Sequence, residues 1–465
     1  MALIKISSNS KTSLVEQVVN ELKSLVEHDV LRTGSRATSI RTFALQHHIS
    51  AHTVAEAYER LVALGYLQSR PRSGFFVTKP HHLLDSPAHS RIIARDFDHM
   101  WQLRSYFEER PDMTNFSSGH LPASWMDSDL IKSGLKSLAS KADTALTQYG
   151  DPYGYAPLRT LLQSKLLGLG IHSQPDQLLL TSGASQATDL VIRCLLQPGD
   201  KVLVDDPGYF NLFSNLHMQG AIALPVPRNT DGPDLDRLEQ LAQEHKPVAM
   251  FTQSMLHAPT GSSISPGNAH RLLRLAEQYD FRIVENDAYC DMLAPQLPRI
   301  ATLDQLSRVL YIGSFSKTLS SAMRVGFIAG NEKLMHELAN MKMTASITSS
   351  QLDERLVFHC LTEGQYRRNL ERLRYRLSIS MQQSCDLLES LGYQLFCRPL
   401  GGKFVWLRHP DYDNSEEIWR LAADAGIGIS PGKVFRVGMS PTPWFRINVS
   451  IGNDPALIKF LSALR

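Results

Sequence analysis

Cysteine is scarce in this sequence, and its spacing does not fit the common metal or disulfide motifs. The 465 residues contain five cysteines, with no C-x-x-C pair and no Cys/His metal spacing: Cys194, Cys290, Cys360, Cys385 and Cys397. This pattern argues against a disulfide framework and against a zinc site. We expect reduced thiols and no bound metal.

The sequence also lacks membrane-spanning and export signals. No stretch approaches the roughly 18–20 consecutive apolar residues that a bilayer-spanning helix needs. The opening stretch, MALIKISSNSKTSLVEQ, shows neither the apolar core of a secretion signal nor an arginine- and serine-rich transit pattern. We expect a cytoplasmic protein.

A large excess of one charge is absent, but the charge is unevenly distributed. The formal net charge is +2, and the composition of 43% hydrophobic and 20% charged residues excludes wholesale disorder. Residues 1–80 hold ten Lys/Arg against six Asp/Glu, a net charge of +4, so the other residues carry −2. At about 100–200 residues per domain the chain has room for several domains. The charge division favours a basic head and a body with a different partner.

Three short helical patterns and a hairpin occupy the basic head, residues 1–78. Residues 13–28 place apolar side chains at helical spacing behind Ser13, a residue type that caps helices. Similar patterns cover 39–48 and 52–65, and residues 66–77 alternate weakly around a turn, as a two-stranded wing does. These elements predict a winged helix-turn-helix, whose third helix enters the DNA major groove. A small helical interaction domain is the alternative.

The head resembles the GntR-type winged helix in the order and spacing of its motifs. The family's G-x-x-L-P-S-x-R signal reads GSRATSIR at 34–41, its S-R-x-T-V reads SAHTV at 50–54, and its wing glycine motif reads SGFFV at 73–77. The resemblance implies a double-stranded DNA operator as partner. The residues implied to contact DNA phosphates and bases are Arg36, Arg41, Ser50, His52, Thr53, Arg72 and Gly74. Ala51 stands where many relatives have an arginine, so one base-reading side chain is missing.

The rest of the chain divides into a linker and a large body. Residues 79–112 have prolines near both ends and no long helical period, which predicts a linker that docks in part on the body. From 113 to 465, short β-rich runs alternate with helical segments. This alternation predicts an α/β fold with a mainly parallel sheet, whose ligand site lies at the carboxyl ends of the strands.

Four motifs stand at these predicted strand ends. TSGASQATDL at 181–190 offers helix-start amides that suit a phosphate, and DDPGY at 205–209 offers an aromatic ring. ENDAY at 285–289 offers a carboxylate and a phenol two residues apart, which would face the same side on a continuing strand. SFSKTLS at 314–320 offers a lysine between hydroxyls, with an arginine seven residues after it. Each motif is weak alone, and their order carries the inference.

That order resembles the fold type I aminotransferases that use pyridoxal 5′-phosphate (PLP), from about Asn115 to the end of the chain. Supporting matches are Pro259-Thr260-Gly261, Gly401-Gly402 and Phe445-Arg446. The resemblance implies that the body has a large part at about 113–345. A smaller C-terminal α+β part is implied at about 346–465.

The same resemblance implies a role for each residue of the site. Lys317 would form the Schiff base with the cofactor aldehyde, which requires an amine that can be neutral near pH 7. Asp287 would pair with the pyridine nitrogen, Tyr289 would hydrogen-bond the phenolic oxygen, and Tyr209 would stack on the ring. Arg446 would bind the α-carboxylate of an amino acid. The residues implied to hold the phosphate are Ala184, Ser185, Ser314, Ser316 and Arg324.

Two departures from this family pattern bear on activity. Ala258 precedes the Pro-Thr-Gly where the family has an asparagine that donates to the phenolic oxygen, so a donor is missing. Asn211 stands two residues after the stacking tyrosine, where relatives that sense γ-aminobutyrate have an arginine. That ligand is therefore not supported.

A GntR-like head ahead of an aminotransferase-like body resembles the MocR subfamily of bacterial regulators over nearly the whole chain. This implies a PLP-binding transcription factor that binds an operator as a head-to-tail homodimer and responds to PLP or to an amino acid or amine. An aminotransferase with an accessory DNA-binding domain is the alternative, because the lysine and arginine of that chemistry are present. A sensor of PLP itself is a third reading.

Overall fold

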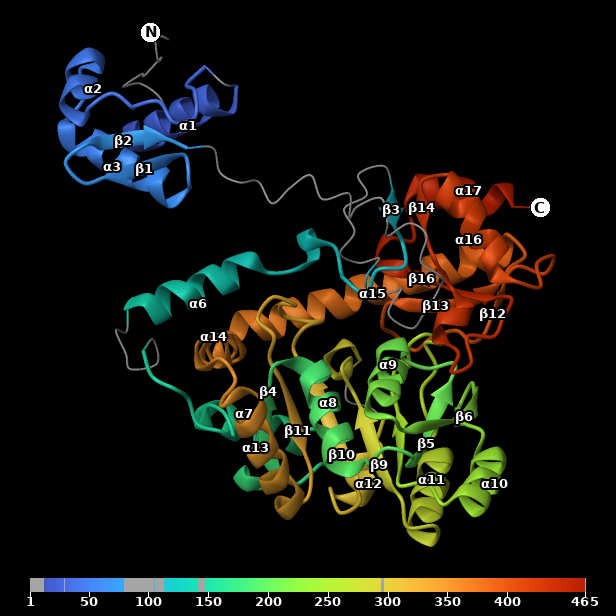
Figure 1. Ribbon diagram of the computed structural model, residues 1–465. Helices are drawn as coiled ribbons and strands as arrows, with labels where there is room; N and C mark the ends of the chain where they lie inside the picture. Colours follow the sequence, from blue (N-terminus) through green and yellow to red (C-terminus); the bar gives the residue numbers. More distant parts are fainter. Residues whose placement is uncertain are drawn as a thin grey trace. The chain divides into compact units, whose positions relative to one another are not determined.

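The computed structural model describes residues 12–28, 30–78, 104, 113–140, 147–293 and 297–464. The chain forms two compact units, Met1–Asp96 and Phe97–Arg465, here called the head and the body (Figure 1). The linker predicted at 79–112 lies outside the described residues, apart from Arg104. Among the described residues, no helix combines the length and the apolar character that crossing a membrane requires.

The head contains the three predicted helices and the wing. Its helices are α1 (Leu14–Glu27), α2 (Ile40–His47) and α3 (Ala51–Ala63), followed by the antiparallel strands β1 (Leu67–Arg70) and β2 (Gly74–Val77). Each helix begins behind a serine whose hydroxyl accepts a backbone N–H of the first turn: Ser13, Ser39 and Ser50. Apolar faces of the three helices and the wing form one core around Val54, Tyr58 and Leu61. The predicted element order of the head is confirmed.

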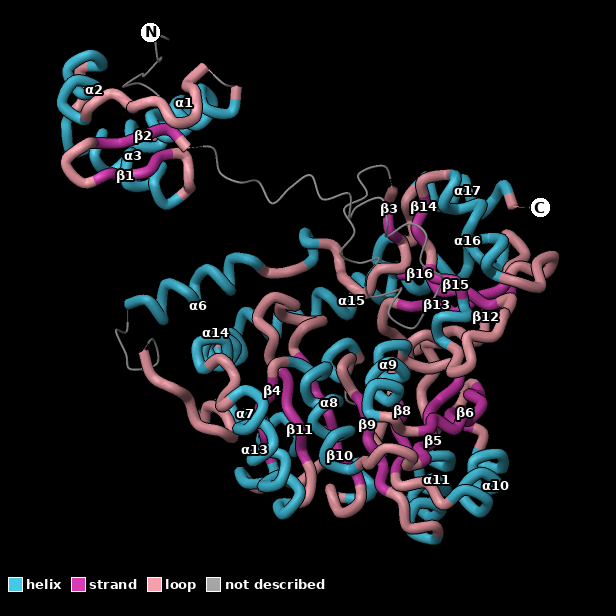
Figure 2. Tube along the Cα trace, in the orientation of Figure 1, coloured by secondary structure: helices cyan, strands magenta, loops and turns pink. Residues whose placement is uncertain are grey.

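An eight-stranded sheet forms the centre of the body (Figure 2). Strands β10, β9, β8, β5 and β6 are neighbours in that order and parallel, whereas β11 runs antiparallel between β10 and β4. The strands are β4 (Leu178–Thr181), β5 (Lys201–Asp206), β6 (Ile222–Asn229), β7 (Gly232–Pro233), β8 (Ala249–Thr252), β9 (Arg282–Asn286), β10 (Val309–Ser314) and β11 (Gly326–Ala329). The predicted α/β fold with a mainly parallel sheet is confirmed.

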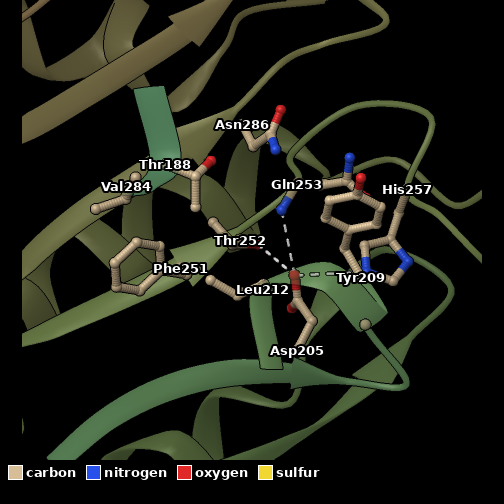
Figure 3. A pocket seen from close by; sticks show the side chains of 11 residues that line it. Thr188, Asp205, Tyr209, Leu212, Phe251, Thr252, Gln253, His257, Val284 and Asn286 are labelled. Atoms are coloured by element: carbon tan, nitrogen blue, oxygen red, sulfur yellow. Dashed lines mark hydrogen bonds and ion pairs between the residues drawn. The ribbon is translucent and has the colours of Figure 1, made fainter. Parts of the chain in front are cut away.

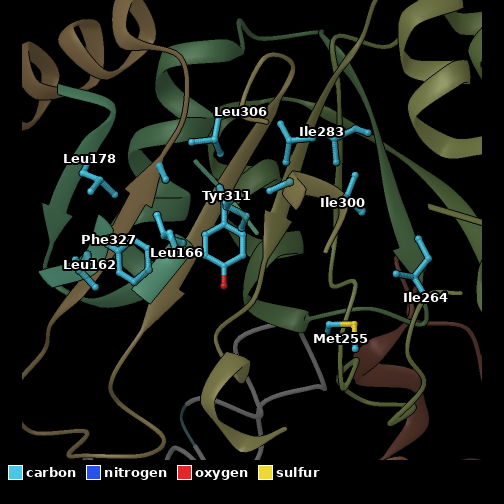
Figure 4. Packing of buried hydrophobic residues seen from close by; sticks show 14 of the residues in the cluster. Leu162, Leu166, Leu178, Met255, Ile264, Ile283, Ile300, Leu306, Tyr311 and Phe327 are labelled. Atoms are coloured by element: carbon cyan, nitrogen blue, oxygen red, sulfur yellow. The ribbon is translucent and has the colours of Figure 1, made fainter. Parts of the chain in front are cut away.

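Helices cover both faces of this sheet, and most of its side chains are buried, with the exposed ones on β6. The helices on one face are α8 (Gly183–Leu195), α9 (Phe210–Gln219) and α13 (Glu332–Ser346). Those that pack into the other core are α6 (Ser128–Ser140), α7 (Ala156–Leu167), α10 (Leu235–His245), α11 (Pro266–Gln278), α12 (Ile300–Asp304) and α14 (Gln351–Thr362). Figure 4 shows this second core, where Leu162 and Leu166 of α7 pack near Tyr311 and Phe327 of the sheet.

A smaller antiparallel sheet completes the body, with strand order β12-β13-β16-β15. Its strands are β12 (Gln394–Leu395), β13 (Phe404–Arg408), β15 (Ser430–Pro431) and β16 (Trp444–Asn448), and its helices are α15 (Gly364–Ser390), α16 (Ser415–Asp424) and α17 (Pro455–Ala463). The short 3₁₀ turns of the body are Ala123–Trp125, Pro175–Gln177, Cys290–Met292, Gly432–Phe435 and Val449–Ile451. This arrangement is an α+β C-terminal part, as the resemblance implies, but α14, which lies in the range 346–465 expected for that part, packs into the core of the large sheet instead.

One pairing brings the beginning of the body to this smaller sheet. Strand β3 (Thr114–Asn115) runs parallel to β14 (Ile427–Gly428), and Asn448 N donates to Phe116 O at 2.9 Å. The segment that follows β3, residues 117–120, therefore lies beside strand β16. Its carbonyl groups accept hydrogen bonds from the side chains described next.

Candidate functional site

A pocket opens at the carboxyl ends of the parallel strands, as the fold rule for such sheets predicts. Figure 3 shows the side chains around it. They come from helix α8, from β5, β8 and β9, and from the segments that follow these strands: Thr188, Asp205, Gly208, Tyr209, Leu212, Phe251, Thr252, Gln253, His257, Val284 and Asn286. The cavity volume of the pocket is about 20 Å³, room for about one water molecule. The predicted ring-stacking residue Tyr209 thus lines the pocket at the strand ends.

A buried charge network holds one wall of this pocket in place. Asp205 accepts from Arg228 Nη1 at 3.1 Å, Thr252 Oγ1 at 2.8 Å and the backbone N–H of Gln253 at 3.2 Å. His257 Nε2 lies 3.5 Å from Asp205 Oδ2, and burial together with Arg228 lowers the pKa of His257 well below its ordinary value. The histidine is therefore neutral at pH 7, and the carboxylate of Asp205 is balanced by the arginine.

The predicted phosphate residues gather at the start of α8. Arg324 Nη1 donates to Ser316 Oγ at 3.2 Å, and Arg324 Nη2 donates to Ser182 O at 3.4 Å, beside the first turn of the helix. Ser314, at the end of β10, accepts from the backbone N–H of Ser316 at 3.2 Å. Ala184 and Ser185 lie in the first turn of α8, where backbone N–H groups point out of the helix. The structure thus brings all five predicted phosphate residues to one place.

Glycine is required at residue 183, next to these five residues, which are here called the phosphate cradle. Gly183 has φ +81°, and a Cβ on it would lie 2.6 Å from Arg324 Nη2. Any larger residue would therefore displace the guanidinium from Ser182 and Ser316. Backbone amides, two hydroxyls and one arginine around such a glycine match the donors that a phosphate needs.

Lys317 follows β10 and is half-buried near the segment 117–120. Its Nζ donates to Gly119 O at 3.2 Å, and it lines a cavity of about 300 Å³ with Gly119, His120 and Ser316. Burial, with the positive charges of Arg324 and Arg446, lowers the pKa of Lys317 from 10.5 to about 8. A substantial fraction of this amine is therefore neutral near pH 7 to 8, the form that reacts with an aldehyde.

Asp287 does not face the pocket in the way that the sequence predicts. Strand β9 ends at Asn286, so the expectation of a continuing strand through Asp287 and Tyr289 is wrong. Asp287 Oδ2 accepts from Arg299 Nε and from Tyr311 OH, both at 2.9 Å, within the core that α7 and α12 cover. Its other oxygen, Oδ1, is buried without a hydrogen-bond partner among the described residues.

Glu285 lies on the same side of β9 as Asp287 and also stabilises the fold. Its carboxylate accepts from the backbone N–H groups of Ile300 at 3.0 Å and Ala301 at 2.8 Å, and from the hydroxyl of Ser254. Burial raises the pKa of Glu285 to about 7. Glu285 and Asp287 therefore anchor the segment around α12 from the side of the sheet opposite to the pocket.

Asn286 is the β9 residue that faces the pocket. It lines the same pocket as Tyr209 (Figure 3). Val284, two residues earlier and therefore on the same face of the strand, lines it too. The sequence analysis missed this residue. The signal that was available is the two-residue period of the strand, because Val284 and Asn286 must share a face whichever face takes the ligand.

Tyr289 and Ala258 lie together on a small apolar cluster beside the pocket. Tyr289 follows the strand end and is buried against Phe404, with ring centroids 6.3 Å apart. Ala258 is buried in the same cluster, and its backbone N–H donates to Gln253 Oε1 at 2.9 Å. Gln253 is itself a pocket residue. The amide side chain nearest to the position of the missing asparagine is thus Gln253.

Arg446 lies on β16 and is held between two aromatic rings. Its guanidinium carbon lies 4.0 Å from the ring centroid of Phe404 and 4.6 Å from that of Phe435. Its Nη2 donates to Ser117 O at 2.8 Å. The segment 117–120 therefore contacts both Arg446 and Lys317, and the two residues predicted to hold an amino acid and a cofactor belong to one site.

A second lysine, Lys403, reaches the same place and was not predicted. Its Nζ also donates to Gly119 O, and it lies 5.2 Å from the ring centroid of Tyr289. The side chain is 2% exposed. A charged residue between Gly402 and the apolar run FVWL was the signal in the sequence, since such a position is normally filled by an apolar residue.

The predicted DNA-contacting residues of the head lie in the segment before α2, on α2, at the start of α3 and on the wing. Five of them are exposed: Arg36, Arg41, Ser50, His52 and Arg72. Thr53 and Gly74 are partly buried. Arg36 pairs with Phe76 of the wing as an isolated bridge, and a Cβ on Gly74 would lie 3.5 Å from its guanidinium.

Ser50 and Thr53 have a role in the structure that the sequence analysis did not assign to them. Ser50 Oγ accepts from the backbone N–H of Thr53 at 3.0 Å and lies 2.7 Å from Thr53 Oγ1. These hydroxyls therefore fix the start of α3. A DNA contact by either one remains a prediction.

Comparison with known families follows the same division of the chain. Residues 111–464 match the family described as Aminotransferase class I and II. Residues 14–77 match the family described as Bacterial regulatory proteins, gntR family. The two matches cover the body and the head, respectively.

Individual relatives include both regulators and an enzyme. A Bacillus subtilis (strain 168) protein named “Uncharacterized HTH-type transcriptional regulator YdfD” is 27% identical over 90% of this chain and 89% of its own length. The 2-aminoadipate transaminase of Thermus thermophilus is 31% identical over 70% of this chain and 83% of its own length. Among solved structures, LysN, an α-aminoadipate aminotransferase from T. thermophilus complexed with N-(5′-phosphopyridoxyl)-L-leucine, is 26% identical. It covers 81% of this chain and 95% of its own, with a TM-score of 0.71.

Proposed function

Because the chain belongs to the aminotransferase class I and II family and carries a gntR-family domain ahead of it, we propose that it is a PLP-binding transcriptional regulator of the MocR type. The observation that carries this proposal is the union of the two domains in one chain, shared over nearly the full length of the regulator YdfD. The body would sense PLP or an amino compound, and the head would bind an operator.

The residues of the body fit PLP at its phosphate and at its aldehyde. The cradle around Gly183 would hold the phosphate through Ser314, Ser316 and Arg324, and Lys317 would attach the cofactor covalently. Tyr209 would pack on the ring. When bound, the cofactor supplies an electron sink for an amino group.

The fit fails at one point, the pyridine nitrogen. The pocket residue from β9 is the amide of Asn286, because Asp287 is bonded to Arg299 and Tyr311 on the other side of the strand. A neutral amide does not stabilise a protonated ring nitrogen as a carboxylate does, and the electron sink is weakened without that proton. This departure favours sensing over turnover and agrees with the absence of a donor at Ala258.

We expect covalent loading with PLP to depend on pH through the Lys317 amine. Its pKa of about 8 makes roughly a tenth of it neutral at pH 7, so the loading rate should rise severalfold from pH 7 to 8 and then level off above pH 9. A lysine with its ordinary pKa would give a rate that still rises steeply above pH 9. Mixing the cofactor-free protein with PLP at pH 6.5–9.5 and following the visible absorption measures this. A rate that rises about tenfold per pH unit across the whole range contradicts the assignment.

The head would bind DNA mainly through charge. The exposed arginines of the head and the exposed start of α3 support this, and two heads on a homodimeric body would bind two half-sites. Effector binding would act through a coupling free energy between site and operator, typically about 1–3 kcal/mol. That energy corresponds to roughly a 5- to 150-fold change in operator affinity.

Arg72→Ala tests the wing separately. Arg72 lies in the β1–β2 turn with φ +62° and is exposed, so its loss should leave the core of the head unchanged. We expect weaker binding to all sequences and a salt-dependence slope reduced by about one unit, as for one lost phosphate contact. Arg398→Ala is the control, because that arginine pairs with Asp386 and Glu389 in the body. An unchanged slope for Arg72→Ala would argue that the wing does not contact DNA.

The alternative function is PLP-dependent transamination. Lys317 and Arg446 meet at segment 117–120, and the T. thermophilus relative is named a transaminase. The deciding experiment titrates the full-length protein against the upstream DNA of its own gene, with and without PLP and a panel of amino acids. Specific binding that changes with PLP or an amino acid supports the regulator. Multiple-turnover transfer from amino donors to oxo acids, without specific DNA binding, would establish the enzyme instead.

A further inference from the structure

Lys403 is buried where segment 117–120 meets Lys317 and Arg446, a place here called the effector site. It lacks the hydrogen-bond partners that surround Lys342, the other fully buried lysine among the described residues. Lys342 donates to Pro152 O at 2.9 Å and to Leu180 O and Ser349 Oγ at 2.8 Å each. Burial lowers the pKa of Lys342 to about 8, and the nearby carboxylate of Glu354 opposes that shift. Its three acceptors and nearby carboxylate satisfy a buried ammonium group. Lys342 therefore has the surroundings of a structural lysine.

Lys403 has fewer hydrogen-bond acceptors than Lys342 and no nearby carboxylate among the described residues. Its one hydrogen bond goes to Gly119 O, which also accepts from Lys317, and no carboxylate lies within ion-pair distance of it in the described part of the chain. Its charged neighbours are the cations Lys317 and Arg446. Burial, and then these two positive charges, lower the pKa of Lys403 well below its ordinary value. Three basic side chains thus converge on segment 117–120, and a bound anion would stabilise their protonated forms.

Lys403 lines a small pocket whose lining includes neither Lys317 nor Arg446. It directly precedes strand β13 beside Phe404, and it lines a narrow pocket with Leu256, Gly261 and Tyr289. Lys317 lines a different cavity and meets Lys403 at the Gly119 carbonyl. Arg446, predicted to hold the α-carboxylate, lies on the neighbouring strand β16 against the ring of Phe404. A ligand held by Arg446 beside Lys317 would have a further polar partner in Lys403.

We propose that Lys403 is a second anion-binding residue of the effector site, and that the effector carries two acidic groups, as a dicarboxylic amino acid or oxo acid does. This inference rests on the proposed function, because it assigns the substrate class of the same site. One acidic group would pair with Arg446. The other would replace the Gly119 carbonyl as the partner of Lys403, forming a charge-assisted hydrogen bond.

Calorimetric titration of the PLP-loaded, DNA-free full chain tests the proposal with matched ligand pairs. L-Aspartate, L-glutamate and L-2-aminoadipate are compared with L-2-aminobutyrate, L-norvaline and L-norleucine, which replace the distal carboxylate by a methyl group. We expect at least one dicarboxylate to bind about tenfold or more tightly than its partner. Lys403→Met should remove that preference while changing the affinity for the methyl analogue little. Lys403→Arg should retain the preference, because it keeps the charge.

Two results would overturn the inference. One is the absence of any preference for a dicarboxylate in the wild-type chain, including the case in which no amino acid binds. The other is a preference that survives unchanged in Lys403→Met, with the visible spectrum of bound PLP showing that the variant is folded. The proposed function is judged separately, since operator binding that responds to PLP alone would support it even if every amino acid failed.

Discussion

Lys317→Ala is expected to abolish covalent loading with PLP and the visible absorption that accompanies it. Lys317 is the lysine beside the phosphate cradle, and its lowered pKa leaves a reactive neutral fraction near pH 8. After mixing with PLP, reduction with borohydride and proteolysis, mass spectrometry should find about one labelled lysine per wild-type chain and only background label in the variant. The fold should persist, because the cradle residues and the sheet remain.

The control for this experiment is Lys333→Ala, which removes an exposed lysine from the first turn of α13. That variant should load like the wild type. Lys403 is the other lysine to which PLP could attach, since its amine also donates to the Gly119 carbonyl. Stoichiometric label on Lys403 or any other lysine in Lys317→Ala would show that Lys317 is not the attachment residue.

The sequence predicts the fold well because the fold depends on patterns that repeat along the chain. Alternating strands and helices specify a parallel sheet covered on both faces, and serine caps mark the starts of α1, α2 and α3. The phosphate cradle is also predictable, since Gly183, the serines around Lys317 and Arg324 come from ordered motifs at strand ends. These features depend on local sequence, which a single chain displays directly.

The choice between Asn286 and Asp287 depends on information that the sequence does not carry. Both faces of a covered parallel sheet are apolar, so alternation along β9 separates two sets of residues without saying which set meets the ligand. The carboxylate was the natural choice for a pyridine nitrogen. In the structure, its face of the strand meets Arg299, a residue 12 positions later that forms a buried ion pair with Asp287. Only the packing of α12 against the sheet reveals this.

The surroundings of Lys403 are a second feature that the sequence does not reveal. The glycine pair before it, taken alone, predicts an exposed turn residue, because lysine is rarely buried. Its burial follows from the pairing of β13 with β16 and of β3 with β14, which bring residues distant in sequence around one carbonyl. The charged residue ahead of the apolar run FVWL indicates that Lys403 is buried, but the local sequence does not show which residues surround it.

Asn286→Asp is expected to change the state of the bound cofactor more than any other single substitution in the pocket. An aspartate at this position places a carboxylate in the pocket beside Tyr209 and would stabilise a protonated ring nitrogen. With ¹⁵N-labelled PLP, the ring-nitrogen resonance should move toward its protonated value. Any transamination should rise on the order of tenfold or more, because a pKa change of one unit corresponds to about that factor.

Asp287→Asn is the matched control, since it makes the reverse change one residue along and on the other side of β9. We expect it to leave the ring-nitrogen resonance unchanged but to lower the free energy of unfolding by about 3 kcal/mol, because it removes the charge that pairs with buried Arg299. The opposite pattern, in which Asp287→Asn moves the resonance and Asn286→Asp does not, would show that Asp287, and not Asn286, contacts the ring nitrogen. The pair of variants therefore separates the residue that meets the cofactor from the one that holds the sheet to α12, and it decides whether the body lacks the charge that an efficient transaminase requires.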